Sequence, residues 1–239
     1  MQFNLTTRLL TLCLFVFMGQ GLAIAQDTTK KDEKLKFSCL YWEGAPAEDL
    51  FYRDKKSFRH LEFKEGSRSK SFSLDGASSF ELYRKAEKPK EGQPPYDLLS
   101  KTKLPQSKKI LFVVIPINQK GGVRYNVFAM DDSLKAFPAG AFRFANFSTE
   151  TLLVKCGKTV KKIPARATTV IKSDKKTNGG FVPFIIGNAQ GKTVFGTRIF
   201  GQPSGRELIF ISPPAKKGAM PRVKFISELI APSLPEPTP

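Results

Sequence analysis

The residues at 187–193, Gly-Asn-Ala-Gln-Gly-Lys-Thr, come nearest to a chemical motif in this sequence. A phosphate-binding loop also ends in Gly-Lys-Thr, and its backbone N–H groups wrap the phosphates of a nucleotide just before a helix begins. That loop has four residues between its glycines, whereas three separate Gly187 from Gly191, and the residues after Thr193 have the pattern of a strand. We therefore interpret the stretch as a hairpin turn and expect no nucleotide.

The single histidine, His60, limits the enzymes that this chain could be. A Ser-His-Asp triad would have to include it, yet the sequence has no Gly-x-Ser-x-Gly turn to supply a nucleophile. His60 alternates with Leu61 and Phe63, which predicts a position on the surface. Zinc ligands are too few, and Asp131-Asp132 is only a fragment of a calcium site, better explained as a turn. We predict no catalytic residue, no metal and no cofactor.

Positive charge is concentrated between residues 135 and 176, where ten lysines and arginines face only Glu150 and Asp174. A turn at Cys156-Gly157 between two short apolar runs predicts a hairpin that gathers basic side chains. These residues are predicted to bind an anion: Lys155, Lys158, Lys161, Lys162 and Arg166. Such a site would hold a polyanion by charge, with a strong dependence on salt. The alternative is that lysines protect the edge of a sheet.

Two cysteines, Cys39 and Cys156, follow the N-terminal apolar segment. In an oxidising compartment they could form a disulfide, and the other interpretation is two buried thiols. The only tryptophan, Trp42, is better explained as a core residue than as a sugar-binding surface. Asn146-Phe147-Ser148 fits the acceptor pattern for N-glycosylation. The predicted signal peptide resembles those of bacteria, however, so we expect no glycan.

The first 25 residues have the layout of a secretory signal peptide. Arg8 is followed by an apolar run over 9–18, and Ala-Ile-Ala at 23–25 predicts cleavage before Gln26. The break at Gly19-Gln20-Gly21 makes the run too short for a membrane anchor, and no later segment is apolar enough to span a bilayer. We expect an exported protein, periplasmic or extracellular, without an integral membrane segment after cleavage.

The formal net charge of the chain is +18, and only Arg8 of the predicted signal peptide contributes to it. Basicity therefore belongs to the exported part, and its natural partners are polyanions. We expect an anionic envelope polymer or another envelope protein as the partner. The oligomeric state is left open.

Hydrophobic residues alternate with polar ones between 35 and 230, and Gly, Pro, Asn or Ser recur at short intervals. This pattern predicts an all-β protein made of two consecutive β-sandwich (Ig-like) units with few or no helices. We assign a flexible leader to 26–36, an N-terminal sandwich to 35–130, a C-terminal sandwich to 131–230 and a disordered proline-rich tail to 231–239. One continuous sheet system is the alternative. The apolar run at 108–117 predicts a strand that is buried on both faces.

A family resemblance rests on the order of short motifs over about residues 130–215: Phe-Pro-x-Gly, an aromatic strand, Asn-x-Ser, a short apolar strand ending in Gly, a second hairpin and the late RELIFISPP. This order resembles an uncharacterised family of small exported bacterial β-sandwich proteins. It is also faintly similar to the accessory β-sandwich proteins that assist acetylation of envelope polysaccharides. The resemblance implies an exported β module and assigns no catalytic residue.

The sequence thus favours a non-enzymatic, envelope-associated module that binds an anionic polymer or a protein, or that has a structural role. A polysaccharide-modifying enzyme or accessory protein is the alternative, with a cleft drawn from Glu43, Glu48, Asp49 and Asp54. A third hypothesis is an assembly partner that pairs through a sheet edge.

Overall fold

The computed structural model describes residues 34–88, 95–119, 122–172, 179–214, 216 and 218–230. They belong to one compact unit, Lys34–Pro239. The predicted signal peptide, most of the predicted leader and the predicted tail lie outside the described residues. The last two leader residues, Leu35 and Lys36, instead begin the first strand.

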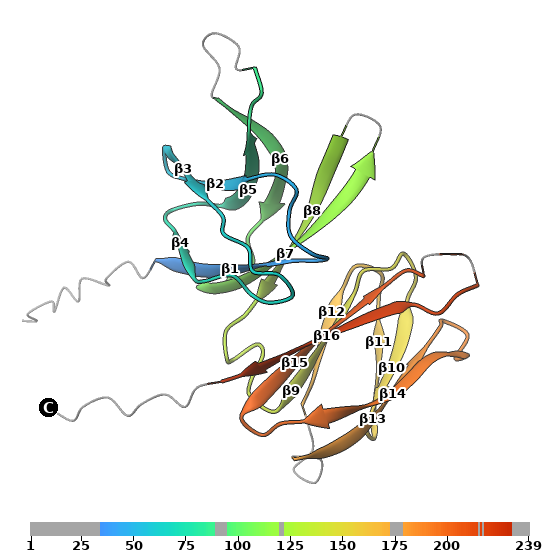
Figure 1. Ribbon diagram of the computed structural model, residues 1–239. Coiled ribbons are helices and arrows are strands. Elements are labelled where there is room, and N and C mark those ends of the chain that lie inside the picture. Colours follow the sequence, from blue (N-terminus) through green and yellow to red (C-terminus); the bar gives the residue numbers. More distant parts are fainter. Residues whose placement is uncertain are drawn as a thin grey trace, which may run out of the picture. The chain divides into compact units, whose positions relative to one another are not determined.

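Sixteen strands and no helix are found among the described residues (Figure 1). In chain order they are β1 (Leu35–Tyr41), β2 (Leu50–Asp54), β3 (Ser57–His60), β4 (Phe72–Leu74), β5 (Ser79–Lys85), β6 (Tyr96–Lys103), β7 (Lys109–Gln119), β8 (Gly122–Asp131), β9 (Ala141–Asn146), β10 (Leu152–Cys156), β11 (Thr159–Ile163), β12 (Thr168–Lys172), β13 (Gly180–Gly187), β14 (Thr193–Gly201), β15 (Gly205–Ser212) and β16 (Arg222–Leu229). The predicted all-β class is confirmed. In this part of the chain, no helix is long and apolar enough to cross a membrane.

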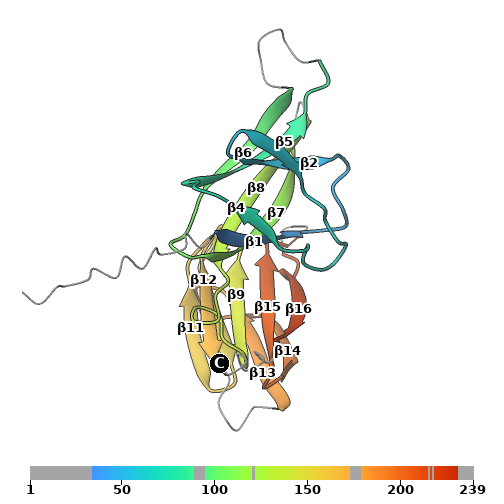
Figure 2. The same cartoon turned by 90° about the vertical axis from the view of Figure 1, so that its left-hand side faces the viewer.

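The strands form four sheets of four, in the orders β4-β1-β7-β8, β3-β2-β5-β6, β12-β9-β15-β16 and β11-β10-β13-β14. The first two sheets use β1–β8 and the last two use β9–β16, which matches two consecutive β-sandwich units. Neighbouring strands are antiparallel except for β1 beside β7 and β9 beside β15, which run parallel. Figure 2 shows β9 and β15 side by side.

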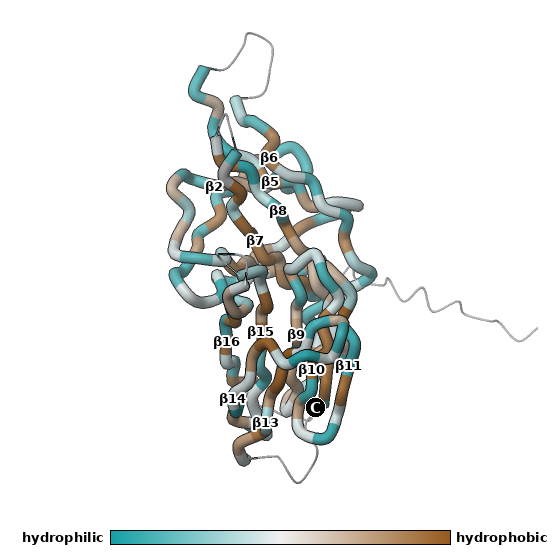
Figure 3. The backbone as a smooth tube through the Cα atoms, turned by 90° about the vertical axis from the view of Figure 1, so that its right-hand side faces the viewer, coloured by the Kyte–Doolittle hydropathy of each residue, from teal (hydrophilic) through white to brown (hydrophobic). Residues whose placement is uncertain are grey.

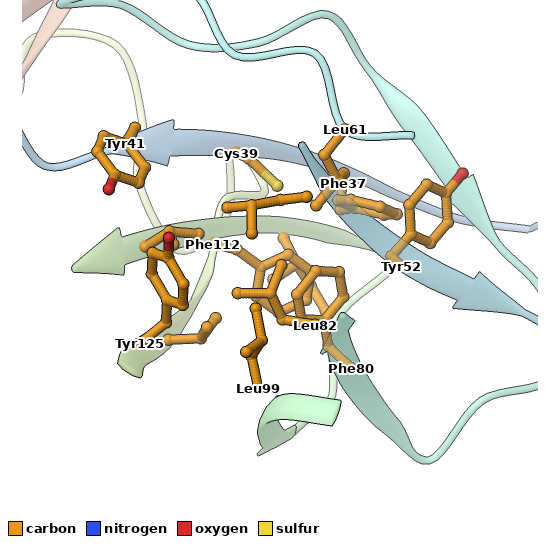
Figure 4. Close-up of a cluster of buried hydrophobic side chains, with 14 of the residues drawn as sticks. Phe37, Cys39, Tyr41, Tyr52, Leu61, Phe80, Leu82, Leu99, Phe112 and Tyr125 are labelled. Carbon is orange, nitrogen blue, oxygen red and sulfur yellow. The ribbon is translucent and has the colours of Figure 1, made fainter. Parts of the chain in front are cut away.

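Aromatic side chains fill the core of the first sandwich (Figure 4). Phe37 of β1 contacts Tyr52, Phe80 and Phe112 with ring centroids 5.0 to 5.5 Å apart, and all three contacts are edge to face. Phe80 stacks on Phe112 at 4.0 Å. Burying each such ring stabilises the fold by about 1.5–3 kcal/mol.

Strand β7 is buried on both faces, as its unbroken apolar run predicts. Ile110, Phe112 and Val114 belong to the first core, whereas Leu111 and Val113 belong to a separate cluster with Phe210 of β15. Strand β15 behaves in the same way, because all eight of its residues are buried. Both strands carry long brown segments in the hydropathy colouring of Figure 3.

Trp42 lies in this second cluster with 5% of its surface exposed. Its ring meets Phe147 and Phe210 edge to face, each at 5.5 Å, and the ammonium group of Lys224 lies 5.6 Å from its centroid. The prediction that Trp42 fills a core is therefore confirmed. It is unavailable to stack on a sugar.

The two cysteines lie in different cores, and no disulfide joins them. Cys39 is in the first sandwich, among the rings shown in Figure 4, and burial raises the pKa of its thiol. Cys156 belongs to the core of the second sandwich. The suggested bridge between Cys39 and Cys156 is thus corrected: two cysteines in one exported chain need not lie close enough to pair in the fold.

Asn146, in the glycosylation-type triplet, is completely buried at the end of β9. Its amide nitrogen donates to the carbonyl oxygens of Glu150, Ile163 and Pro164 at 2.8 to 3.2 Å. Its side-chain oxygen accepts from the backbone N–H and the hydroxyl of Ser148. The side chain thereby fixes the turn that leads from β9 toward β10.

A cluster of four charged residues connects loops and strands that are distant in sequence. Arg68 donates to both carboxylate oxygens of Asp132, at 2.6 and 3.0 Å, and also to Glu228. Arg206 forms ion pairs with the same two acids, each at 2.9 Å. The predicted turn at Asp131-Asp132 is present over 133–137, but Asp132 is also completely buried and is the shared partner of both arginines.

A third arginine, Arg143 of β9, is buried beside this cluster. It donates to the backbone oxygen of Asp131 at 2.6 Å, and its guanidinium group lies 4.5 Å from the ring centroid of Phe137. Burial lowers its pKa to about 10. One of the ten basic residues counted between 135 and 176 is therefore a core residue and contributes nothing to an exposed strip.

Candidate functional site

The predicted basic hairpin is formed by β10 and β11, which pair antiparallel from Leu152 opposite Ile163 to Cys156 opposite Thr159. Its two loop residues are Gly157 and Lys158, one position later than predicted. Gly157 has a φ of 59°, as the first position of a type II′ hairpin requires. A Cβ there would also lie 3.3 Å from Val182, so the position suits glycine.

All five predicted anion-binding residues are exposed, but the fold divides them. Lys155 pairs with Val160, and Lys162 with Leu153, on the face of the sheet that points away from the core. Lys161 pairs with the buried Val154 and lies on the opposite, core-facing side. Since consecutive residues of a strand alternate, the Lys161-Lys162 pair cannot serve one face.

Three of the five residues thus lie apart from Lys155 and Lys162. Lys161 is an inward-directed charge on β11, an edge strand, and such charges discourage pairing with another sheet. Lys158 occupies the hairpin loop. Arg166 lies in the turn from Pro164 to Ala167, with a φ of 56°.

The outward face of β10 and β11 continues across β13 and β14. Lys155 is opposite Ile185, which is opposite Gly196, and the next row contains Pro183 and Arg198. Rows on one face of a strand are about 7 Å apart. Arg198 is exposed and adds a cation that the sequence analysis missed.

An exposed aromatic pair lies in the following row. Phe181 of β13 and Phe200 of β14 are directly opposite each other, with ring centroids 5.4 Å apart and planes at 69°. Their exposed fractions are 68% and 43%. Large apolar side chains gathered on a surface are a common sign of a contact site. We call the following residues the aromatic-basic face: Leu153, Lys155, Val160, Lys162, Phe181, Pro183, Ile185, Arg198 and Phe200.

No acidic residue occurs in β10, β11, β13 or β14. Within the described part of the chain, Lys155, Lys162 and Arg198 form no ion pair. The face therefore has positive charge that no described acid neutralises by an ion pair, next to rings that can pack against the C–H groups of a sugar. The strands that form it carry no carboxylate or imidazole that could transfer a proton.

The acids considered for an enzymatic cleft do not converge. Glu48 and Asp49 line a cavity of about 600 Å³ with His60 and Glu62, but Glu43 and Asp54 lie outside it. Most of these groups have partners: Glu48 accepts from Tyr125 at 3.0 Å, and Asp49 lies 3.2 Å from His60.

Glu43 and Asp54 form ion pairs with Arg222 and Arg59, at 2.6 and 3.1 Å. His60 is exposed, as predicted. No group of three or more potential metal ligands occurs among the described residues.

The stretch at 187–193 forms the hairpin turn between β13 and β14, as predicted. The side chain of Asn188 accepts from the backbone N–H groups of Gln190 and Lys192, which closes the turn without a phosphate.

No protein-family model matches the chain. No curated protein matches it either. The resemblance to small exported bacterial proteins therefore stays a prediction.

Proposed function

We propose that this chain is an exported, non-enzymatic binding module that holds an acidic polysaccharide of the cell envelope against the aromatic-basic face. One observation supports this most directly: Lys155, Lys162 and Arg198 form no ion pair with any acid that the structure describes, and they share a face with the exposed Phe181–Phe200 pair. The basic composition and the predicted signal peptide agree with a polyanion outside the cytoplasm.

The two kinds of side chain make separate contributions to binding. The cations release counterions from the polymer, so the affinity falls as salt rises. The aromatic pair contributes contacts with sugar rings that do not depend on charge, and these persist when salt screens the cations. An acidic polysaccharide satisfies both requirements, whereas an uncharged one satisfies only the second.

The test is retention of the purified protein on immobilised heparin and on a carboxylated polysaccharide across a salt gradient. We expect Lys155→Ser/Lys162→Ser/Arg198→Ser to elute at markedly lower salt than the wild type. The matched control is Lys56→Ser/Lys85→Ser/Lys103→Ser, which removes three exposed charges from the first sandwich. Equal elution of the two triple variants would contradict the proposal, because retention would then depend on net charge alone.

A second pair of variants tests the aromatic contribution. We expect Phe181→Ser/Phe200→Ser to weaken binding of soluble acidic oligosaccharide at high salt, whereas Leu98→Ser, at a position that is 47% exposed on β6, leaves it unchanged. If the aromatic variant binds as the wild type does, the face recognises charge without sugar. If the protein instead self-associates in sedimentation and binds no polysaccharide, pairing through a sheet edge replaces this proposal.

A further inference from the structure

A second site is indicated by a cavity of about 680 Å³ that shares no lining residue with the aromatic-basic face. Its walls come from β1, the loop before β4, the start of β7, and β16. Cavities of this size typically hold a small ligand rather than a polymer. What distinguishes this one is the charge of its lining.

Two lysines lie directly side by side in the wall. Lys36 of β1 and Lys109 of β7 are partners in the parallel ladder, so their side chains leave the sheet on the same face. Like charges in neighbouring positions on one face repel each other. Neither lysine forms an ion pair with any described acid.

A third lysine is contributed by the loop. Lys64 and Ser67 face each other in an isolated bridge, with the N–H of Ser67 donating to the carbonyl of Lys64 at 3.2 Å. The turn between them depends on Gly66, whose φ is 65°. Lys64 is exposed and also lacks an ion pair within the described residues.

The floor of the cavity does not neutralise these lysines. It contains Arg68, Arg206 and Glu228, which with Asp132 form the cluster described above. Two arginines and two carboxylates cancel in charge. Every donor of Arg68 is already used, by Asp132, Glu228 and the hydroxyl of Ser38. Three lysines therefore remain uncompensated around a neutral floor.

One hydroxyl in the lining is also without a partner. The Oγ atom of Ser67 is buried and makes no hydrogen bond. A buried hydroxyl without a partner costs about 1–3 kcal/mol. The nearby Ser69, by contrast, accepts from the backbone N–H of Cys39 and donates to the carbonyl of Lys70.

We propose that this cavity binds a phosphate group, with Lys36, Lys64 and Lys109 as its cationic ligands and the hydroxyl of Ser67 as a hydrogen-bond donor. A phosphate monoester has close to two negative charges at neutral pH and three oxygens that accept hydrogen bonds, which suits several converging donors. The exposed Leu134 and Leu229 line the same cavity, so an apolar substituent on the phosphate would have a surface to contact.

The experiment is calorimetric titration of the purified protein with inorganic phosphate, a short alkyl phosphate, sulfate and acetate at constant ionic strength. We expect phosphate to bind more tightly than acetate. Lys36→Gln/Lys109→Gln should weaken phosphate binding about tenfold or more, because charge-assisted hydrogen bonds are lost. Ser67→Ala should weaken it less and leave the fold intact.

Lys85→Gln/Lys103→Gln removes the same charge elsewhere and should bind phosphate as the wild type does. No binding to the wild type, or equal weakening in this control, would overturn the proposed site. Tighter binding of the alkyl phosphate than of inorganic phosphate would identify an amphiphilic phosphate ester as the ligand, and the reverse order would identify free phosphate. Polysaccharide retention is expected to be unchanged in the Lys36/Lys109 variant, so this proposal and the one for the aromatic-basic face can fail separately.

Discussion

The sheet β3-β2-β5-β6 and the sheet β11-β10-β13-β14 both cover a core on one side. They differ in which residues lie opposite the charged side chains on neighbouring strands. In the first, opposite charges face each other across strands: Glu81 pairs with Lys101, and Arg84 with Asp97. In the second, each outward cation faces an apolar residue: Lys155 faces Val160, Lys162 faces Leu153, and Arg198 faces Pro183.

This difference separates charge that serves the fold from charge that is available to a partner. A cross-strand pair of opposite charges helps to specify strand register and contributes a fraction of a kcal/mol. Cations opposite apolar residues give the sheet no such benefit, and their mutual repulsion opposes folding. We therefore infer binding from the second sheet and solubility from the first, although both have exposed lysines.

The largest effect is expected where paired charge is buried. Asp132→Ala leaves Arg68 and Arg206 without a shared partner in the interior and should lower the free energy of unfolding by about 3–5 kcal/mol. Urea denaturation measures this. Asp97→Ala, which removes a carboxylate that is 52% exposed, should lower it by about 1 kcal/mol or less. Similar losses in the two variants would show that the buried cluster is no more important than a surface pair.

An intermediate effect is expected from adding an acid to the unpaired sheet. A Cβ at Gly196 would meet nothing within 4 Å, so Gly196→Glu can be accommodated in the row of Lys155 and Ile185. We expect stability to change by only about 0.5 kcal/mol. The variant should elute from immobilised polysaccharide at lower salt. The slope of log affinity against log salt concentration should also be smaller by roughly one. Gly196→Gln is the uncharged control, and equal loss in both variants would indicate steric obstruction.

The smallest effect is expected from breaking a surface pair. The side-chain hydrogen bond from Lys101, and next that from Tyr83, lower the pKa of Glu81 below its ordinary value of 4.5. The stabilisation is therefore present above about pH 4.5 and disappears as the pH falls through the lower, folded-state pKa. Glu81→Gln should cost about 0.2–1 kcal/mol at neutral pH and almost nothing in acid. Thermal unfolding at both pH values measures the difference, and a cost that persists in acid would refute the electrostatic origin.

The sequence predicts the strands well because their patterns are local. The apolar run of β7 requires two buried faces. Gly157 predicts the turn between β10 and β11 from the local sequence alone, wherever that hairpin lies in the fold. Alternation along a strand already places Lys161 and Lys162 on opposite faces. The prediction of a five-residue anion site did not take this into account.

The sequence predicts the candidate site poorly because faces are set by long-range pairing. All six residues over 181–186 are apolar, so both faces of this strand have the same pattern. Periodicity therefore does not show that Phe181 is exposed and Phe184 is buried. Arg143 has the same composition signal as an exposed arginine, and only its position beside Asp131 and Phe137 shows that it is buried. The cavity depends on β1 pairing with β7, more than sixty residues later, which no local pattern reveals.

The buried amide of Asn146 has a practical consequence for producing the protein. In a eukaryotic secretory pathway, the enzyme that attaches glycans would meet Asn146-Phe147-Ser148 on the nascent chain, before folding hides it. A glycan on that nitrogen cannot fit in the interior, and it would displace the contacts to Glu150, Ile163 and Pro164. Chains modified there would fail to fold. The protein should therefore be produced in a bacterial host or in another host that does not attach N-linked glycans.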